Sequence, residues 1–193
     1  MHYLLHKPYG YLSQFVCDVK KKKLLGDLYA FAPGTMAIGR LDEDSEGLLL
    51  LTEDGRLSER IRGREMEKEY HVQVDGLITV EAIQQLRNGV EIGIKGSKYQ
   101  TLPCMVNAIQ DPGYALRSRK IRDDRHGPTS WVSVTLTEGK LRQVRKMIAA
   151  VGFPALRLIR VRIGQLQLGD LKVGEVREAV DLEKLLYYNT QQL

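Results

Sequence analysis

The distribution of apolar residues predicts a series of short strands. Residues 68–74, KEYHVQV, alternate so that Tyr70, Val72 and Val74 share one face of a strand. Further strands are predicted for six segments: 3–5, 11–16, 35–38, 48–52, 131–137 and 155–163. Residues 99–110 also have strand character, but they include a proline, which lacks the N–H that a central strand needs. We therefore expect an edge strand or a bulged strand there.

Helical periodicity appears at fewer places. Residues 141–151 are the clearest case, because one apolar stripe runs along them and Gly152 follows. The stripe consists of Leu141, Val144, Ile148 and Val151. Another helix is predicted between Thr79, a suitable N-cap, and Gly89, a suitable C-terminal glycine. Two shorter helices are predicted: 56–62 and 181–188. Strands and helices interleave without a regular βαβ rhythm, which favours an α+β fold over a doubly wound α/β fold.

Length and composition narrow the class of protein. The chain has 193 residues, of which 43% are hydrophobic, so it can bury a core and is not a disordered chain. Cys17 and Cys104 are isolated in the sequence, which indicates neither a disulfide framework nor a zinc knuckle. No apolar run approaches the roughly 20 residues of a membrane span, and the first residues lack the apolar stretch of a signal peptide. We expect a cytoplasmic protein that does not enter a membrane.

Charge points to an anionic partner, although the net charge of +5 is modest. A loop at 114–125 lies between two turn signals and is rich in basic residues: Arg117, Arg119, Lys120, Arg122 and Arg125. The predicted helix and strand after it add more: Arg142, Arg145, Lys146, Arg157, Arg160 and Arg162. We expect these elements to form one positive surface that contacts nucleic-acid phosphates, against the alternative of ordinary solvated side chains. A separate basic run, Lys20 to Lys23, precedes a short apolar segment.

The polar loop at 39–47, GRLDEDSEG, contains the densest group of acids. Its acids have nearly the spacing of an EF-hand calcium loop, but the apolar run at 48–51 occupies ligand positions and no helix precedes the loop. We therefore expect no metal site. A carboxylate such as Asp42, before a buried strand and near Arg40, can stay ionised and attack a sugar or base carbon. The alternatives are that these acids cap turns, or that two of them form a glycoside hydrolase site.

Three motifs, in order along the chain, resemble those of the RNA pseudouridine synthases that modify ribosomal RNA. GRLD at 39–42, followed by DSEGLLLLTEDG, resembles the catalytic loop of that family. KEYHVQV at 68–74 resembles its Lys-x-Tyr strand, and EGKLRQVRKM at 138–147 resembles its basic helix motif. RLIRVRIG at 157–164 and GEVREA at 174–179 also fit, so the resemblance covers nearly the whole chain. It implies a mixed, largely antiparallel central sheet with flanking helices and a central active-site cleft.

The resemblance also implies an activity and a site. The enzyme would be an isomerase that detaches uracil from its ribose, rotates the base and rejoins it through C5, without cofactor or metal. Asp42 would be the nucleophile at C1′ of the sugar or C6 of the base, and Arg145 would pair with Asp42 and keep it ionised. Tyr70 would stack on the flipped uracil or help to move a proton. The expected RNA-binding residues are Arg40, Arg117, Arg119, Lys120, Arg122, Arg142 and Lys146.

The resemblance implies a substrate and an organisation as well. The substrate would be a uridine in 23S ribosomal RNA of the large subunit, or in its precursor particle. We expect one catalytic domain over residues 1–193, with two lobes divided near 64–67 and without the N-terminal S4-type domain that many relatives carry. We also expect a monomer. The competing hypothesis is a non-catalytic RNA-binding or ribosome-assembly module in which the loop acids are structural.

Overall fold

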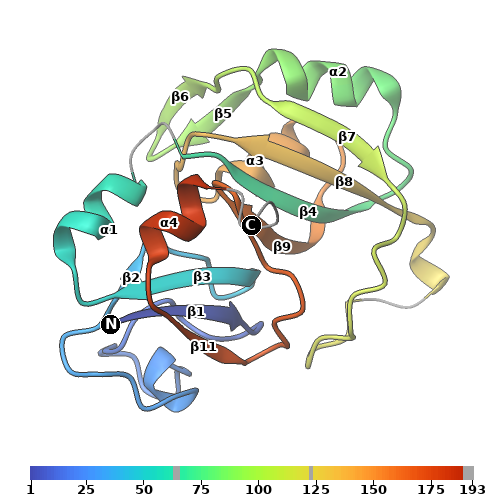
Figure 1. Cartoon of the computed structure of the whole chain (residues 1–193). Coiled ribbons are helices and arrows are strands. Elements are labelled where there is room, and N and C mark those ends of the chain that lie inside the picture. Colours follow the sequence, from blue (N-terminus) through green and yellow to red (C-terminus); the bar gives the residue numbers. More distant parts are fainter. Residues whose placement is uncertain (63–65, 122–123, 189–193) are drawn as a thin grey trace. The chain divides into compact units, whose positions relative to one another are not determined.

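The structure, a computed structural model, describes residues 1–62, 66–121 and 124–188 (Figure 1). The chain forms two compact units. The first combines Met1–Met66 with Ile159–Leu193, and the second is the continuous segment Glu67–Leu158. One approximate boundary was predicted near 64–67, whereas the second boundary, after Leu158, was not predicted. Each unit is described separately below.

The first unit is built on paired strands (Figure 1). Its strands are β1 (His2–Lys7), β2 (Met36–Ile38), β3 (Glu46–Thr52), the second half of β9 (Ala155–Ile163), β10 (Leu166–Gln167) and β11 (Val176–Ala179). β1 lies between β3 and β11 and is antiparallel to both, whereas β9 pairs with β3 in parallel at Ile159 and Arg160. The helical segments are η1 (Leu25–Asp27), α1 (Gly55–Arg62) and α4 (Leu182–Tyr187).

The four leucines of β3 explain why this strand lies at the centre of the first unit. Leu48 to Leu51 are all fully buried, so side chains on both faces of the strand are covered. A strand that is covered on both faces needs a continuous apolar run instead of alternation. β3 also has neighbours along both edges, β1 on one side and β9 on the other. Because β3 follows the polar loop 39–45, its rigid start fixes where that loop ends.

The second unit is an antiparallel sheet with two helices and a hairpin (Figure 1). Its main strands are β4 (Lys68–Asp75), β7 (Met105–Ile109) and β8 (Thr129–Leu136), and β8 lies between the other two. β5 (Glu91–Ile94) and β6 (Ser97–Gln100) form the hairpin. The helical segments are α2 (Val80–Asn88), η2 (Asp124–His126) and α3 (Gln143–Ala150). The mixed, mostly antiparallel pairing within the units confirms the predicted α+β class.

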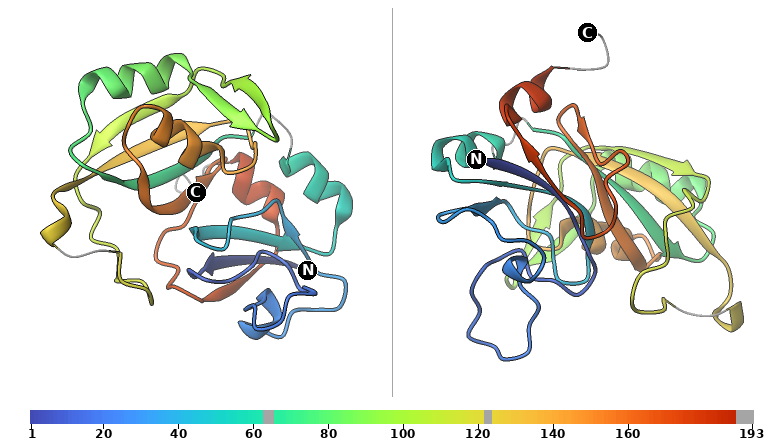
Figure 2. Two further views of the ribbon diagram at one scale, coloured as in Figure 1. Left: turned by 180° about the vertical axis from the view of Figure 1, so that it is seen from behind. Right: turned by 60° about the horizontal axis from the view of Figure 1, so that its bottom comes forward.

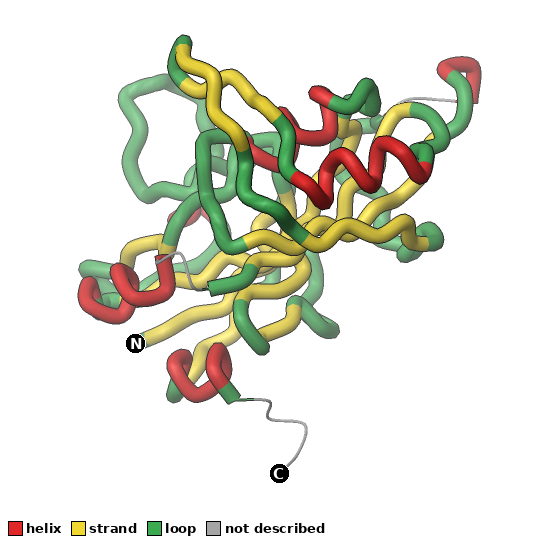
Figure 3. The backbone as a smooth tube through the Cα atoms, turned by 90° about the horizontal axis from the view of Figure 1, so that it is seen from above, coloured by secondary structure: helices red, strands yellow, loops and turns green. Residues whose placement is uncertain are grey.

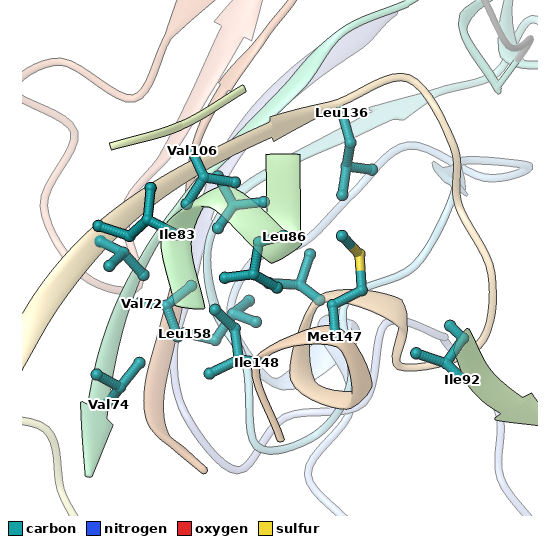
Figure 4. Close-up of a cluster of buried hydrophobic side chains, with 13 residues drawn as sticks. Val72, Val74, Ile83, Leu86, Ile92, Val106, Leu136, Met147, Ile148 and Leu158 are labelled. Carbon is teal, nitrogen blue, oxygen red and sulfur yellow. The ribbon is translucent and has the colours of Figure 1, made fainter. Parts of the chain in front are cut away.

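The core of the second unit lies between its strands and its two α-helices (Figure 4). Val72 and Val74 of β4 are fully buried, as the alternation of KEYHVQV predicts. Helix α2 contributes Leu86 and helix α3 contributes Met147 and Ile148, all of which are at most 1% exposed. Thr79 is the N-cap of α2, as predicted, and its hydroxyl accepts a hydrogen bond from the N–H of Ala82. The helix that carries Arg145 is therefore held by its apolar side.

Two predicted strands differ from the structure. Residues 11–16 do not form a strand: the segment has an isolated bridge between Tyr11 and Lys23, and the side chain of Ser13 bonds to the backbone of Leu41. The predicted strand at 99–110 is divided between β6 and β7. Between them the N–H of Leu102 donates to the carboxylate of Glu138 instead of to a neighbouring strand. β7 does lie at the edge of its sheet, as the proline predicted.

The predicted helix at 141–151 begins later than expected. Arg142 has φ of 53°, in the left-handed region, so regular helix starts only at Gln143. Leu141 consequently lies outside the apolar stripe and is 57% exposed.

Loops connect most of the short helices and strands of the chain (Figure 3). Among the described residues, no helix has the length and apolarity to span a membrane.

Candidate active site

Asp42 lies in a loop of the first unit that hydrogen bonds hold in place. The loop joins β2 to β3, and the N–H of Ser45 donates to the carbonyl of Asp42 over 3.0 Å, which closes a turn. Immediately before Asp42, the hydroxyl of Ser13 accepts from the N–H of Leu41 at 3.0 Å and donates to its carbonyl at 2.7 Å. Immediately after it, the N–H of Gly10 donates to the carbonyl of Glu43 at 2.8 Å. The half-buried Asp42 is thus fixed from both sides along the chain.

A buried lysine lies near the same loop. Lys7 ends β1 and is fully buried, and its amine donates to the carbonyls of Pro8 at 2.9 Å and Tyr11 at 2.7 Å. Burial lowers the pKa of Lys7 to about 8, while the negative charges of Glu46, Asp44, Asp42 and Glu43 oppose that shift. At neutral pH the amine is mainly protonated, so a positive charge lies within the field of the acidic loop.

Gly47 allows the end of this loop to approach β9 closely. Its φ is 104°, a conformation that residues with a side chain rarely adopt. A Cβ atom at this position would lie 2.3 Å from the backbone oxygen of Arg160 and 2.6 Å from its nitrogen. Gly47 and Arg160 are partners in the parallel pairing of β3 with β9. A larger residue would therefore displace the strand that begins directly after the acidic loop.

The EF-hand alternative has no support in the geometry of this loop. The residues that would complete a calcium loop, Leu48 to Leu51, are fully buried in β3 and offer no oxygen from their side chains. Across the described part of the chain, no group of three or more His, Cys, Asp or Glu side chains could hold a metal ion.

Arg40, two residues before Asp42, is exposed, as a contact to RNA would require.

The other two predicted catalytic residues belong to the second unit. Tyr70 is on β4, opposite Val134 of β8, and its partly buried ring packs against the core cluster. Arg145 is on α3, and its guanidinium donates to the carbonyl of Ala155 at 3.3 Å. Asp42 is in the first unit, so its pairing with Arg145 stays a prediction. Arg145 lies beside the apolar stripe of α3: Val144 is buried, whereas Arg145 is partly exposed.

Glu138 fixes the start of the helix that carries Arg145. Its carboxylate accepts hydrogen bonds from the hydroxyl of Tyr99, from the N–H of Leu102 at 2.9 Å and from the amide of Gln143 at 2.7 Å. Burial acts to raise the pKa of Glu138, but these hydrogen bonds, together with the charge of Lys140, lower the pKa below its usual value. Sequence reasoning did not single out this residue, although it begins the EGKLRQVRKM motif. The ionised Glu138 thus holds together the loop before α3, α3 itself and the segment after β6.

Two predicted RNA-binding residues lie at this end of α3: Arg142 and Lys146. Arg142 is exposed next to the helix start. Lys146 is one turn further, and its amine donates to the carbonyl of Gly93 in the β5–β6 hairpin at 2.7 Å. A lysine that already binds a carbonyl has fewer N–H groups for phosphate. Arg142 is the more exposed of the two.

The basic loop after β7 is fixed to the sheet by Tyr114. The hydroxyl of Tyr114 lies 2.6 Å from Nδ1 of His71 on β4, and Nε2 of His71 is 3.5 Å from Glu69. Ser133 of β8 also donates to Glu69, at 2.8 Å. Beyond this anchor, Arg117 is half-buried and its guanidinium donates to the carbonyls of Arg119 and Leu156. Arg119 and Lys120 are exposed, whereas Arg122 lies outside the described residues.

The prediction that the β9 arginines extend the positive surface is wrong for two of the three. Arg157 and Arg160 are each only 4% exposed. Arg160 donates to the carbonyl of Leu48 at 2.8 Å, and Arg157 lies over the ring of Tyr114, 5.8 Å from its centroid. Alternation along a strand directs successive residues to opposite faces, and both faces of β9 are largely covered at these positions. Only Arg162, which is partly exposed, is open to solvent.

Comparison with known proteins gives the family. The family model described as RNA pseudouridylate synthase matches residues 1–150, which include the Asp42 loop, the Tyr70 strand and helix α3. The chain belongs to the RNA pseudouridylate synthase family. This confirms the family resemblance carried by the three motifs, and with it the predicted enzyme class, an isomerase.

Two relatives illustrate the similarity in sequence. Ribosomal large subunit pseudouridine synthase E of Vibrio parahaemolyticus is 41% identical over 177 residues, which cover 91% of this chain and 72% of the relative. The enzyme of the same name from Xanthomonas axonopodis pv. citri is 42% identical over 172 residues, which cover 87% of this chain and 88% of the relative. The stretch PTSW at 128–131, after the arginine-rich loop, also resembles this particular enzyme, and the relatives confirm the resemblance.

Solved structures agree with the fold. A crystal structure of a pseudouridylate synthase matches with a TM-score of 0.73 at 28% identity, covering 94% of this chain and 71% of that one. The archaeal box H/ACA sRNP Nop10–Cbf5 complex includes a chain that matches with a TM-score of 0.53 at 15% identity, which shows a shared fold only. The likeness to the first structure confirms the predicted pseudouridine synthase fold.

Proposed function

We propose that this chain converts a specific uridine of large-subunit ribosomal RNA to pseudouridine, acting as a monomer in the cytoplasm. The observation that carries the proposal is the loop of Asp42: the half-buried aspartate lies shortly before the fully buried strand β3, and hydrogen bonds fix the backbone of the loop on both sides of it. The backbone that carries the carboxylate is thus held in one place, which helps to position a nucleophile. Relatives at 41% and 42% identity are named as large-subunit enzymes, which supports the choice of RNA.

The isomerisation needs a nucleophile because the glycosidic bond must break and re-form at a different base atom. In one route the Asp42 carboxylate attacks C1′ of the ribose, and the C1′–N1 bond breaks with its electrons on the uracil. The uracil then turns, its C5 bonds to C1′, and Asp42 leaves as a carboxylate. The hydrogen on C5 is finally lost as a proton, and N1 gains a proton. In the other route Asp42 adds to C6 of the base, and in both routes it is released unchanged.

The remaining residues have roles that follow from charge and shape. Arg145 would keep Asp42 ionised and orient it through a charge-assisted hydrogen bond. Tyr70 would stack on the uracil once the base has left the RNA helix. Extruding a base costs a few kcal/mol, which stacking and phosphate contacts must offset. Arg40, Arg119, Lys120 and Arg142, all exposed, are the proposed source of phosphate contacts.

The Asp42→Asn variant tests the chemistry. It should fold and bind RNA like the wild type, because asparagine has nearly the same shape and Asp42 is only half-buried. It should lose all detectable conversion, since a neutral amide is a poor nucleophile. Tritium release from an RNA transcript labelled at C5 of uridine measures the conversion, and filter binding measures the affinity. Asp44→Asn, two residues along the same loop, is the matched control and should keep activity.

The competing function is a binding module without catalysis. Carbodiimide-based primer extension on ribosomal RNA separates the two in cells. A stop that disappears on deletion of the gene and returns with wild type, but not with Asp42→Asn, supports the enzyme. If both proteins restore the stop, Asp42 is not the nucleophile. If the deletion changes no stop, the chain is not a pseudouridine synthase for this RNA.

A further inference from the structure

We infer that Arg160 of β9 is a positioning residue for Asp42, the proposed nucleophile. This inference rests on the proposed function and gives a role to a buried cation that the proposed mechanism does not use. Arg160 is only 4% exposed and belongs to the first unit, as Asp42 does. We expect it to act through the first residues of β3, which directly follow the loop of Asp42.

The first observation is that Arg160 is joined to the start of β3 in two ways. Its backbone is the partner of Gly47 in the parallel pairing of β3 with β9. Its side chain donates from Nε to the carbonyl of Leu48 at 2.8 Å, and this hydrogen bond is buried. The pairing covers Glu46 and Gly47, so the guanidinium extends it by one residue. A substitution of Arg160 removes this extension and leaves the backbone partners in place.

The second observation is that the start of β3 is closely linked to Asp42. The N–H of Ser45 donates to the carbonyl of Asp42 at 3.0 Å, which closes the turn before the strand. Ser45 and Glu46 are each 1% exposed, so this link is buried. Every residue from Ser45 to Leu48 is buried in the strand or directly before it. In such close packing, a shift at Leu48 is passed on to the turn that carries Asp42.

The third observation concerns the charges on the two strands beside β3. Gly47 is the partner of Lys7 in β1 as well as of Arg160 in β9. β1 and β3 lie side by side in the first unit (Figure 2, left-hand view, dark blue and turquoise). Two buried cations therefore belong to the neighbours of Gly47, directly after a segment that carries four acidic residues: Asp42, Glu43, Asp44 and Glu46. A permanent positive charge in β9 attracts this acidic segment and opposes its displacement.

The fourth observation is that Arg160 is unfavourable for stability. Among the residues that the structure describes, its Nη2 is buried without a hydrogen-bond partner. An unpaired polar atom in a buried charged group is costly, and an apolar residue of similar volume often takes such a place without loss of stability. Stability alone therefore does not account for an arginine here, whereas a role in positioning Asp42 does.

The test compares Arg160→Met with Arg87→Met. Methionine fills much of the same volume as arginine but cannot donate to Leu48. Arg87 is the matched control, because its Nε also donates to the carbonyl of a strand residue, Val106, at 2.7 Å, but in the second unit. We expect Arg160→Met to melt at or above the wild-type temperature, since it removes the unpaired buried atom. Its kcat should fall about 10–100-fold with KM nearly unchanged, whereas Arg87→Met should keep the wild-type kcat.

Two further measurements separate positioning from a loss of structure. Amide hydrogen exchange in residues 42–48, read by mass spectrometry, should be faster in Arg160→Met and unchanged in Arg87→Met. Arg160→Lys keeps a positive charge and a donor that can reach the carbonyl of Leu48. Its kcat should therefore lie closer to that of wild type than to that of Arg160→Met.

The outcomes separate this inference from the proposed function. If Arg160→Met does not fold, or melts well below the wild type, Arg160 has a structural role and the inference fails. It also fails if Arg160→Met keeps the wild-type kcat, if exchange in residues 42–48 is unchanged, or if Arg160→Lys recovers no turnover. If wild type makes no pseudouridine in ribosomal RNA, the proposed function fails, but the exchange of residues 42–48 still shows whether Arg160 holds this loop.

Discussion

Ser13 shows how a single residue fixes the backbone beside Asp42, the proposed nucleophile. Its hydroxyl forms two hydrogen bonds to Leu41, accepting one from the N–H and donating one to the carbonyl. Ser13 is 8% exposed and Leu41 is 6% exposed, so water has little access to replace these bonds. The backbone of Leu41 would otherwise be free to rotate directly before Asp42. We therefore regard Ser13 as a positioning residue for Asp42, the proposed nucleophile.

Replacing Ser13 by alanine should reduce turnover more than RNA binding. Two buried backbone groups lose their partner, which should lower the free energy of unfolding by about 1–3 kcal/mol. A displacement of the proposed nucleophile by about 1 Å can reduce the rate about a hundredfold. We therefore expect kcat to fall about 10–100-fold, with KM nearly unchanged. Steady-state kinetics and urea unfolding measure the two effects.

Two further variants show whether this effect depends on position. Ser13→Thr keeps the hydroxyl and should recover most of the turnover. Thr35→Ala removes another hydroxyl that bonds to a backbone carbonyl, that of Ala32, in the turn before β2. It should lower stability without a comparable fall in kcat. Equal kcat losses in Ser13→Ala and Thr35→Ala would mean that Ser13 has only a structural role.

At the scale of elements, the basic loop after β7 depends on the sheet beneath it. Burial lowers the pKa of His71, so the imidazole is neutral at neutral pH and Nδ1 can accept a hydrogen bond from Tyr114. Burial also raises the pKa of Tyr114 to about 12, which keeps its hydroxyl protonated and able to donate. The ring of Tyr114 also contacts Trp131, with centroids 5.8 Å apart. One tyrosine thus fixes the start of an otherwise exposed loop.

Tyr114→Phe should loosen this loop while keeping its ring contacts. The loss of the hydroxyl leaves Nδ1 of His71 without its donor, and we expect a loss of about 1–3 kcal/mol in unfolding free energy. Amide hydrogen exchange in residues 111–121 should become faster, and affinity for RNA should fall several-fold (about 2–10-fold) because the loop must be ordered on binding. Hydrogen exchange read by mass spectrometry and filter binding measure these changes.

Tyr99→Phe is the control for this experiment, because it removes a hydroxyl bonded to Glu138 in the same unit. Its exchange rates in residues 111–121 should match those of the wild type. If Tyr114→Phe leaves the exchange of that loop unchanged, the tyrosine does not anchor it.

Elements also show which parts of the fold a sequence pattern can predict. The segment KEYHVQV forms β4 because its alternation agrees with burial on one face of the strand. Thr79 is an N-cap because its hydroxyl accepts a hydrogen bond from the N–H of Ala82, only three residues further along the chain. The β5–β6 hairpin was not predicted, although Lys95 and Gly96 both have positive φ, which is typical of a two-residue hairpin turn. Lysine is an unusual first residue for such a turn, so the pattern gave no local signal.

At the scale of the whole chain, sequence reasoning identified the family because motifs need only order and spacing. It could not predict the support of Asp42 in the same way. Ser13 and Leu41 are 28 residues apart, and Lys7 lies near the acidic loop only because β1 pairs with β3. The burial of Arg157 and Arg160 depends likewise on what covers β9. Contacts between distant segments require the fold itself.

The two units differ in how the chain forms them, and this predicts how fragments behave. The second unit is continuous in sequence and has its own buried cluster from two helices and five strands. In the first unit, β1 and β3 come from the start of the chain, but their neighbours β11 and β9 come from its second half. A fragment with residues 1–66 therefore lacks the partners along two strand edges.

We expect residues 67–163, which keep β9 whole, to fold as an isolated fragment, and residues 1–66 to remain unfolded. The longer fragment should show dispersed amide signals in NMR spectra and a cooperative urea transition with a slope of about 1 kcal/mol per molar urea. The fragment 1–66 should show neither, because unpaired edges of β1 and β3 leave polar backbone groups and apolar side chains exposed. Mixing residues 1–66 with a peptide of residues 155–188 should restore signal dispersion if missing partners are the cause. A folded fragment 1–66, or an unfolded fragment 67–163, would show that the units do not fold as their sequence continuity predicts.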